Sequence, residues 1–149
     1  YLLRIGTTVG ANNLYGSGLI TATSATAANL PTNGSTIYAR LCTNYATSQV
    51  CTDYVYTAGT KATMSSPSPS SILPGPNVTF TWTTGAGATS YLLRIGTTVG
   101  ANNLYGSGPI TATSATPANL PTNGSTVYVR LCTNFATSQI CTDYVYTAY

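Results

Sequence analysis

The stretch NVTFTWTT, residues 77–84, decides the fold class of this chain. Its apolar residues Val78, Phe80 and Trp82 alternate with threonines, the pattern of a β-strand with one buried and one solvated face. The rest of the chain has a matching bias, because Thr, Tyr, Val and Ile are abundant and Glu is absent. Such residues favour strands over helices. The sequence therefore predicts an all-β protein.

Around this strand lies a long internal repeat. Residues 1–58 match residues 91–148 at 52 of 58 positions, whereas residues 59–90, which contain NVTFTWTT, occur once. The six differences are Leu19/Pro109, Ala27/Pro117, Ile37/Val127, Ala39/Val129, Tyr45/Phe135 and Val50/Ile140. An offset of 90 residues suits a β-sandwich domain better than a helical solenoid unit. We therefore expect β-sandwich domains that follow one another along the chain.

Further strands are expected after NVTFTWTT. A Gly-Ala-Gly-Ala turn is followed by a strand ending at Gly96, and the remaining strands are predicted around 103–105, 110–115, 126–133 and 139–147. We therefore expect a complete β-sandwich at residues 59–149, with a linker at about 59–66. Residues 1–58 are expected to form an incomplete sandwich, because they lack a copy of the leading strands.

Several short features resemble fibronectin type III and related immunoglobulin-like domains. They are Trp82 in an early strand, Tyr91 opening the next strand, and Leu120-Pro121 ahead of the Tyr-Val-Arg-Leu sequence at 128–131. The resemblance covers about residues 62–148. It implies tandem seven-stranded immunoglobulin-like sandwiches that serve in binding or spacing rather than catalysis.

One spacing departs from that resemblance. The separation of Leu120 from Tyr128 is two residues longer than in the usual tyrosine corner of these domains. Val127, Val129 and Leu131 are expected on the buried face, and Tyr128 is accordingly expected to point outward.

Each repeat contains two cysteines nine residues apart, and its only acidic residue lies two positions after the second cysteine. The cysteines are Cys42, Cys51, Cys132 and Cys141. In an antiparallel hairpin, any register that pairs the two cysteines also places Arg40 opposite Asp53, or Arg130 opposite Asp143. Each repeat is thus expected to carry a cross-strand disulfide beside a cross-strand ion pair. The alternative of a metal site lacks ligands because the chain has no His. Disulfides indicate an oxidising, extracellular compartment.

Side chains for catalysis are scarce. The chain has no His and no Glu, and its two acids, Asp53 and Asp143, occupy equivalent positions in different repeats. They cannot form one catalytic dyad. The Gly-Ala-Gly-Ala sequence at 85–88 lacks the Lys and the helix of a phosphate-binding loop, and we expect it to be a turn. We expect no enzymatic activity, no metal and no cofactor.

Charge and hydropathy disfavour two further kinds of partner. The five cationic residues are spread evenly, which is too sparse for a nucleic-acid surface. No stretch approaches 18 consecutive apolar residues, so membrane insertion is not expected. No intact signal peptide opens the chain. We expect either that processing has removed one or that the sequence is a segment of a longer chain.

Three Asn-x-Ser/Thr sequences are acceptors for covalent glycans in a secreted protein, at Asn33, Asn77 and Asn123. Asn33 and Asn123 each precede a Gly, which also predicts exposed turns. Exposed tyrosines could stack on sugar rings, so a glycan-binding module is a rival hypothesis.

The function expected from these features is that of a structural repeat subunit of an extracellular fibre or surface stalk, with copies of itself as partners in a filament. The missing strands of the first repeat would come from a neighbouring subunit by strand addition, or from residues before Tyr1 in one long chain. The alternatives are a glycan- or cell-binding adhesive module and an accessory domain of a secreted enzyme.

Overall fold

The computed structural model describes residues 1–149 and contains β-strands but no helix, which confirms the all-β prediction. The strands are β1 (Leu2–Gly6), β2 (Tyr15–Leu19), β3 (Thr36–Asn44), β4 (Gln49–Thr57), β5 (Met64–Ser66), β6 (Phe80–Trp82), β7 (Ser90–Gly96), β8 (Tyr105–Gly106), β9 (Ser114–Ala115), β10 (Thr126–Asn134) and β11 (Gln139–Thr147). They fall into two compact units, Tyr1–Gly59 (unit 1) and Thr60–Tyr149 (unit 2). The chain forms no helix of the length and apolarity needed to cross a membrane.

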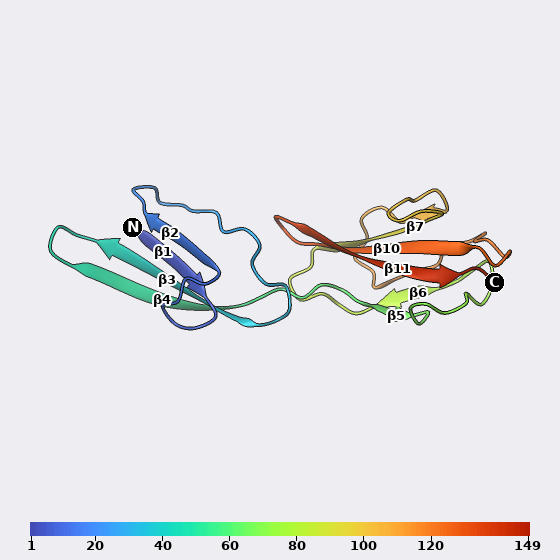
Figure 1. Cartoon of the computed structure of the whole chain (residues 1–149), viewed down its shortest axis with the longest axis horizontal. Coiled ribbons are helices and arrows are strands. Elements are labelled where there is room, and N and C mark those ends of the chain that lie inside the picture. The colour runs from blue at the N-terminus through green and yellow to red at the C-terminus, as the bar shows by residue number, and fades with distance from the viewer. The chain divides into compact units, whose positions relative to one another are not determined.

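Unit 2 is a two-layer β-sandwich (Figure 1). One layer is the antiparallel sheet β11-β10-β7-β8, and the other is the antiparallel sheet β5-β6-β9. The layers are held together by a core in which Phe80, Leu93, Val127 and Tyr146 are at most 1% exposed. The rings of Phe80 and Tyr146 meet edge to face, with centroids 5.6 Å apart and planes at 84°. Aromatic pairs prefer this arrangement because the positive edge of one ring faces the negative face of the other.

The alternation of apolar and polar residues in the sequence corresponds to the buried and outer faces of the sheets. Val78, Phe80 and Trp82 are buried, although the strand β6 itself is only three residues long. In β10, Val127, Val129 and Leu131 are also buried, as predicted from the sequence. Tyr128 lies between two of these positions, is half-buried, and belongs to the opposite face of the sheet.

The segment expected as a linker, residues 59–66, is instead part of unit 2 from Thr60 onward. Ala62 and Met64 lie in the core, and Met64 opens β5, which pairs with β6. The Ala62 amide donates to the hydroxyl of Thr133 at 2.8 Å. Two apolar side chains in a stretch of mainly polar residues are too few to show a strand period, yet their burial helps to dock the segment.

Two other predicted strands are shorter than expected. The strand predicted around 103–105 begins only at Tyr105, in β8. Within 110–115, Ile110 forms an isolated bridge to Tyr91, and the regular strand β9 is limited to two residues.

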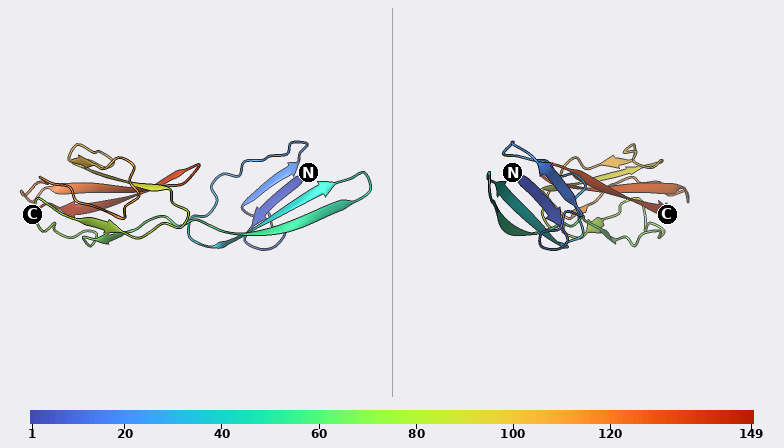
Figure 2. Two further views of the ribbon diagram at one scale, coloured as in Figure 1. Left: turned by 180° about the vertical axis from the view of Figure 1, so that it is seen from behind. Right: turned by 60° about the vertical axis from the view of Figure 1, so that its left-hand side comes forward.

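Unit 1 is a single antiparallel sheet of strand order β2-β1-β3-β4, shown from two further sides in Figure 2. Its β3–β4 pairing repeats the β10–β11 pairing of unit 2 residue for residue, with Cys42 opposite Cys51 and Arg40 opposite Asp53. Unit 1 has no second sheet. Its buried core is correspondingly small and consists of Ile5, Ile37, Ala39 and Ala58.

Candidate functional site: an open apolar face

The outer face of each long hairpin carries the disulfide and the charged pair. Cys42 is bonded to Cys51 and Cys132 to Cys141, which are the pairs predicted from the sequence. In unit 2, Arg130 Nε donates to Asp143 Oδ1 at 2.7 Å and Nη2 donates to Oδ2 at 2.8 Å. Unit 1 has the same two-point contact between Arg40 and Asp53.

The hydrogen bonds from arginine stabilise the ionised carboxylates and lower the pKa of Asp53 and Asp143 below the usual value for aspartate. A glycine at positive φ makes room for each guanidinium. At Gly100, with φ of +79°, an added Cβ would lie 2.5 Å from Arg130 Nη1. The two acids are fully engaged in this way, and the chain has no group of three or more His, Cys, Asp or Glu that could hold a metal ion. This face stabilises the hairpin.

The three glycan acceptor asparagines are all exposed. The Oδ1 atoms of Asn33 and Asn123 accept hydrogen bonds from the amides of Ser35 and Ser125, which fixes a turn. The Oδ1 atom of Asn77 accepts from the Asn119 amide. In each case the side-chain nitrogen, to which a glycan would be attached, is left out of that bond.

The inner face of the sheet differs sharply between the two units, although their sequences are nearly identical. Tyr56 is 56% exposed, whereas its counterpart Tyr146 is 1% exposed. Leu41 is 39% exposed, whereas Leu131 is 1% exposed. Since the residue types are the same, the difference arises from what covers the sheet. We call the inner face of β1, β3 and β4, together with the loop after β2, the open face.

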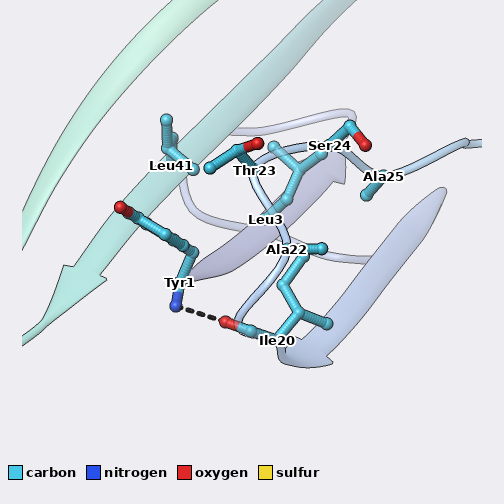
Figure 3. A pocket seen from close by; sticks show the side chains of 8 residues that line it. All are labelled: Tyr1, Leu3, Ile20, Ala22, Thr23, Ser24, Ala25 and Leu41. Atoms are coloured by element: carbon cyan, nitrogen blue, oxygen red, sulfur yellow. Dashed lines mark hydrogen bonds between the residues drawn. The ribbon is translucent and has the colours of Figure 1, made fainter.

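Two apolar cavities lie on the open face. The first, of about 380 Å³, is lined by Tyr1, Leu3, Leu41 and, after β2, residues 20 and 22–25 (Figure 3). The Tyr1 amino group is fixed there by donating to the Ile20 carbonyl at 2.7 Å. The second cavity, of about 460 Å³, also includes Leu3 and extends to Tyr56. Its other apolar lining residues are Ile5, Leu30, Pro31, Ile37, Ala39 and Ala58.

Aromatic side chains from β6 occupy the corresponding spaces in unit 2. Trp82 packs at 6.0 Å between ring centroids against Tyr91, the counterpart of Tyr1, and its amide donates to the Thr113 carbonyl. Phe80 packs against Tyr146, the counterpart of Tyr56. The first cavity thus corresponds to the Trp82 position and the second to the Phe80 position.

The edge of the open face also lacks a partner that unit 2 has. In unit 2, the Ser70 amide donates to the Val145 carbonyl at 3.0 Å and the Leu73 amide to the Thr147 carbonyl at 2.9 Å. The Thr147 amide donates in turn to the Ser71 carbonyl. The equivalent strand of unit 1, β4, is the edge of its sheet and is exposed along its whole length. An exposed edge presents unpaired N–H and C=O groups that can accept another strand.

Comparison with models of protein families and with curated proteins finds no match to this chain. The open face combines apolar cavities with a free strand edge, which is the chemistry of a surface that binds a β-segment.

Proposed function

We propose that the chain is a structural repeat subunit of an extracellular fibre or surface stalk, in which immunoglobulin-like sandwiches follow one another head to tail. The observation that carries this proposal is the open face of unit 1, which is the covered core of unit 2 without its cover. Exposed apolar surface of this kind is unfavourable in water and is typical of a surface made for a partner. Sandwiches completed by a segment of their own polypeptide or of a neighbouring subunit, and joined without closing a ring, form a filament.

The strand arrangement of unit 2 supports the immunoglobulin-like part of the proposal. Seven strands, β5 to β11, form a three-stranded sheet against a four-stranded sheet. This number and division of strands suit a fibronectin type III-like sandwich. Near-identical neighbouring copies are what a spacer built by repetition requires.

Composition and cross-links support an extracellular location. Two disulfides are stable in an oxidising compartment and are rare in reducing ones. Only 5% of the residues are charged, while Ser and Thr together number 43, so hydroxyls and any glycans supply the surface polarity. Asn33, Asn77 and Asn123 are the proposed glycan sites. An intact mass equal to that of the bare polypeptide would remove the glycans from the proposal.

A second candidate is a glycan- or cell-binding module, and the exposed tyrosines of unit 1 are the observation in its favour. Tyr54 and Tyr56 are 44% and 56% exposed, and such rings can stack on sugars. In unit 2, however, the hydroxyls of Tyr144 and Tyr146 are engaged by main-chain groups of residues 64 and 67. The same positions are therefore better explained as contacts for a polypeptide segment.

Negative-stain microscopy of the protein isolated from its source tests the proposed function. We expect filaments or stalks made of regularly repeated beads. A homogeneous, compact monomer in sedimentation experiments on the same material would contradict it.

A further inference from the structure

Residues 60–85, here called the leading segment, cover the inner face of unit 2 through both side chains and main chain. The segment buries Ala62, Met64, Leu73, Val78, Phe80 and Trp82. Four hydroxyl groups of the covered sheet form hydrogen bonds with the main chain of the leading segment. Thr133 and Tyr144 accept from the amides of residues 62 and 64, Tyr91 accepts from the amide of residue 85, and Tyr146 donates to the carbonyl of residue 67.

Unit 1 has kept all four of these hydroxyls, at Thr43, Tyr54, Tyr1 and Tyr56. It also offers the carbonyls of Thr23, Val55 and Thr57 at the positions that accept from the leading segment in unit 2. The replacement of Pro117 by Ala27 still provides a carbonyl where the Val78 amide is bound in unit 2. The open face is therefore complete as a receptor for a leading segment, and only the segment is missing.

The number of leading segments, compared with the number of receptor faces, limits where a segment for the open face can come from. Residues 1–149 contain two receptor faces and one leading segment, which is bound in unit 2. If two copies exchanged segments, each transfer that covered one face would uncover another. Exchange among copies of residues 1–149 thus always leaves one face open per chain.

We propose that the open face of unit 1 binds a second leading segment, carried by the same polypeptide ahead of Tyr1 just as residues 60–90 precede Tyr91. The proposal rests on the proposed function, because it makes unit 1 one sandwich of a covalent tandem array. The segment inserts aromatic side chains into the two cavities at the positions of Trp82 and Phe80, and it pairs with β4 as Ser70–Leu73 pair with β11. Covalent attachment raises the effective concentration of the segment at its face, so each sandwich is completed locally.

A fusion protein tests the proposal. A second copy of residues 60–90 is placed directly before Tyr1 of the 149-residue chain, which reproduces at Ser90–Tyr1 the natural junction Ser90–Tyr91. Hydrogen exchange of the β3 and β4 amides, binding of an apolar fluorescent dye, and sedimentation are then compared with those of the 149-residue chain. We expect exchange in β3 and β4 to slow by at least tenfold and to approach that of β10 and β11, and dye binding to fall severalfold.

The matched control is the same fusion with Phe80→Ser and Trp82→Ser in the added copy alone. Both original units keep their own sequences, so a failure to fold does not confuse the result. We expect the control to exchange and to bind dye like the 149-residue chain.

Three results separate the possibilities. If the added segment leaves the β3 and β4 amides as fast to exchange as before, the inference is wrong. If the 149-residue chain is already a dimer with a protected β4, the open face binds a second copy of itself and the inference is again wrong. If the segment binds as expected but the native material shows no filament, the inference stands and the proposed fibre fails.

Discussion

The same substitution at two equivalent tyrosines should have very different costs. Tyr146→Ala removes a ring that is 1% exposed, that packs against Phe80, and whose hydroxyl donates to the Pro67 carbonyl at 3.0 Å. Truncation of a large aromatic core residue costs about 3–5 kcal/mol, because both its burial and its packing contacts are lost. Tyr56→Ala removes a ring that is 56% exposed. The expected cost there is about 1 kcal/mol, in proportion to its smaller burial.

Urea unfolding followed by tryptophan fluorescence measures the first cost directly. Trp82 is the single tryptophan, and it is 4% exposed in the core of unit 2. With a urea dependence of about 2 kcal/mol per molar, Tyr146→Ala should lower the Trp82 midpoint by about 2 M. Tyr56→Ala, the matched control, should leave that midpoint unchanged, and its own effect is read from hydrogen exchange in β3.

An unchanged midpoint in the Tyr146→Ala variant would refute the packing described for unit 2. A loss of about 3–5 kcal/mol from unit 1 on Tyr56→Ala would show that the open face is covered in solution. In the fusion protein with a second leading segment, by contrast, the cost of Tyr56→Ala should rise to match that of Tyr146→Ala.

The other predictions concern the second hairpin and pH. Replacing Cys132 and Cys141 together by Ser should cost unit 2 about 2–3 kcal/mol, seen as a lower Trp82 midpoint, because closing even a short loop restricts the unfolded chain. The bonds from Arg130 lower the pKa of Asp143, so they stabilise the fold above the unfolded pKa near 3.8, and this contribution is lost as pH falls through the lower folded value. An NMR titration of Asp143 should show that lowered midpoint, and Arg130→Ala should raise it. Burial raises the pKa of Tyr146 from 10.0 to about 12, so the stabilisation that its neutral hydroxyl gives unit 2 is fully present below pH 10 and is lost as pH rises towards 12. Tyr146→Phe should remove that loss, as followed by urea midpoints between these pH values.

The long hairpins and the buried face of the strand at Trp82 could be predicted from the sequence, because each follows from a single residue spacing. The nine-residue cysteine spacing and the matching Arg–Asp spacing defined the long hairpins, and the alternation around Trp82 defined a buried strand face. These patterns are local, because the pleat and the register of a hairpin decide which side chains share a face and which residues lie opposite each other.

Sequence reasoning failed where a segment is held by distant partners rather than by its own pattern. The segment at 59–66 was predicted as a linker, but it docks through Ala62 and Met64 on hydroxyls contributed by β10 and β11. The role of the tyrosine hydroxyls was missed for the same reason. The sequence did contain one signal for these hydroxyls. Alternate positions of β11 share one face, and three of the four residues on that face carry a hydroxyl, which is more than an ordinary core strand has: Ile140, Thr142, Tyr144 and Tyr146.

The identity of the two receptor faces also has a consequence for biosynthesis. During translation, unit 1 emerges first and the leading segment follows it, before Tyr91–Tyr149 has been made. At that moment the face that fits the segment belongs to unit 1, and the two faces differ little in the groups that bind it. The chain itself keeps the segment from this face, because residue 62 would have to reach Thr43, at the end of β3 opposite to Thr57, over only five residues. The segment therefore stays free for its own sandwich, and folding from the N-terminus can proceed one sandwich at a time.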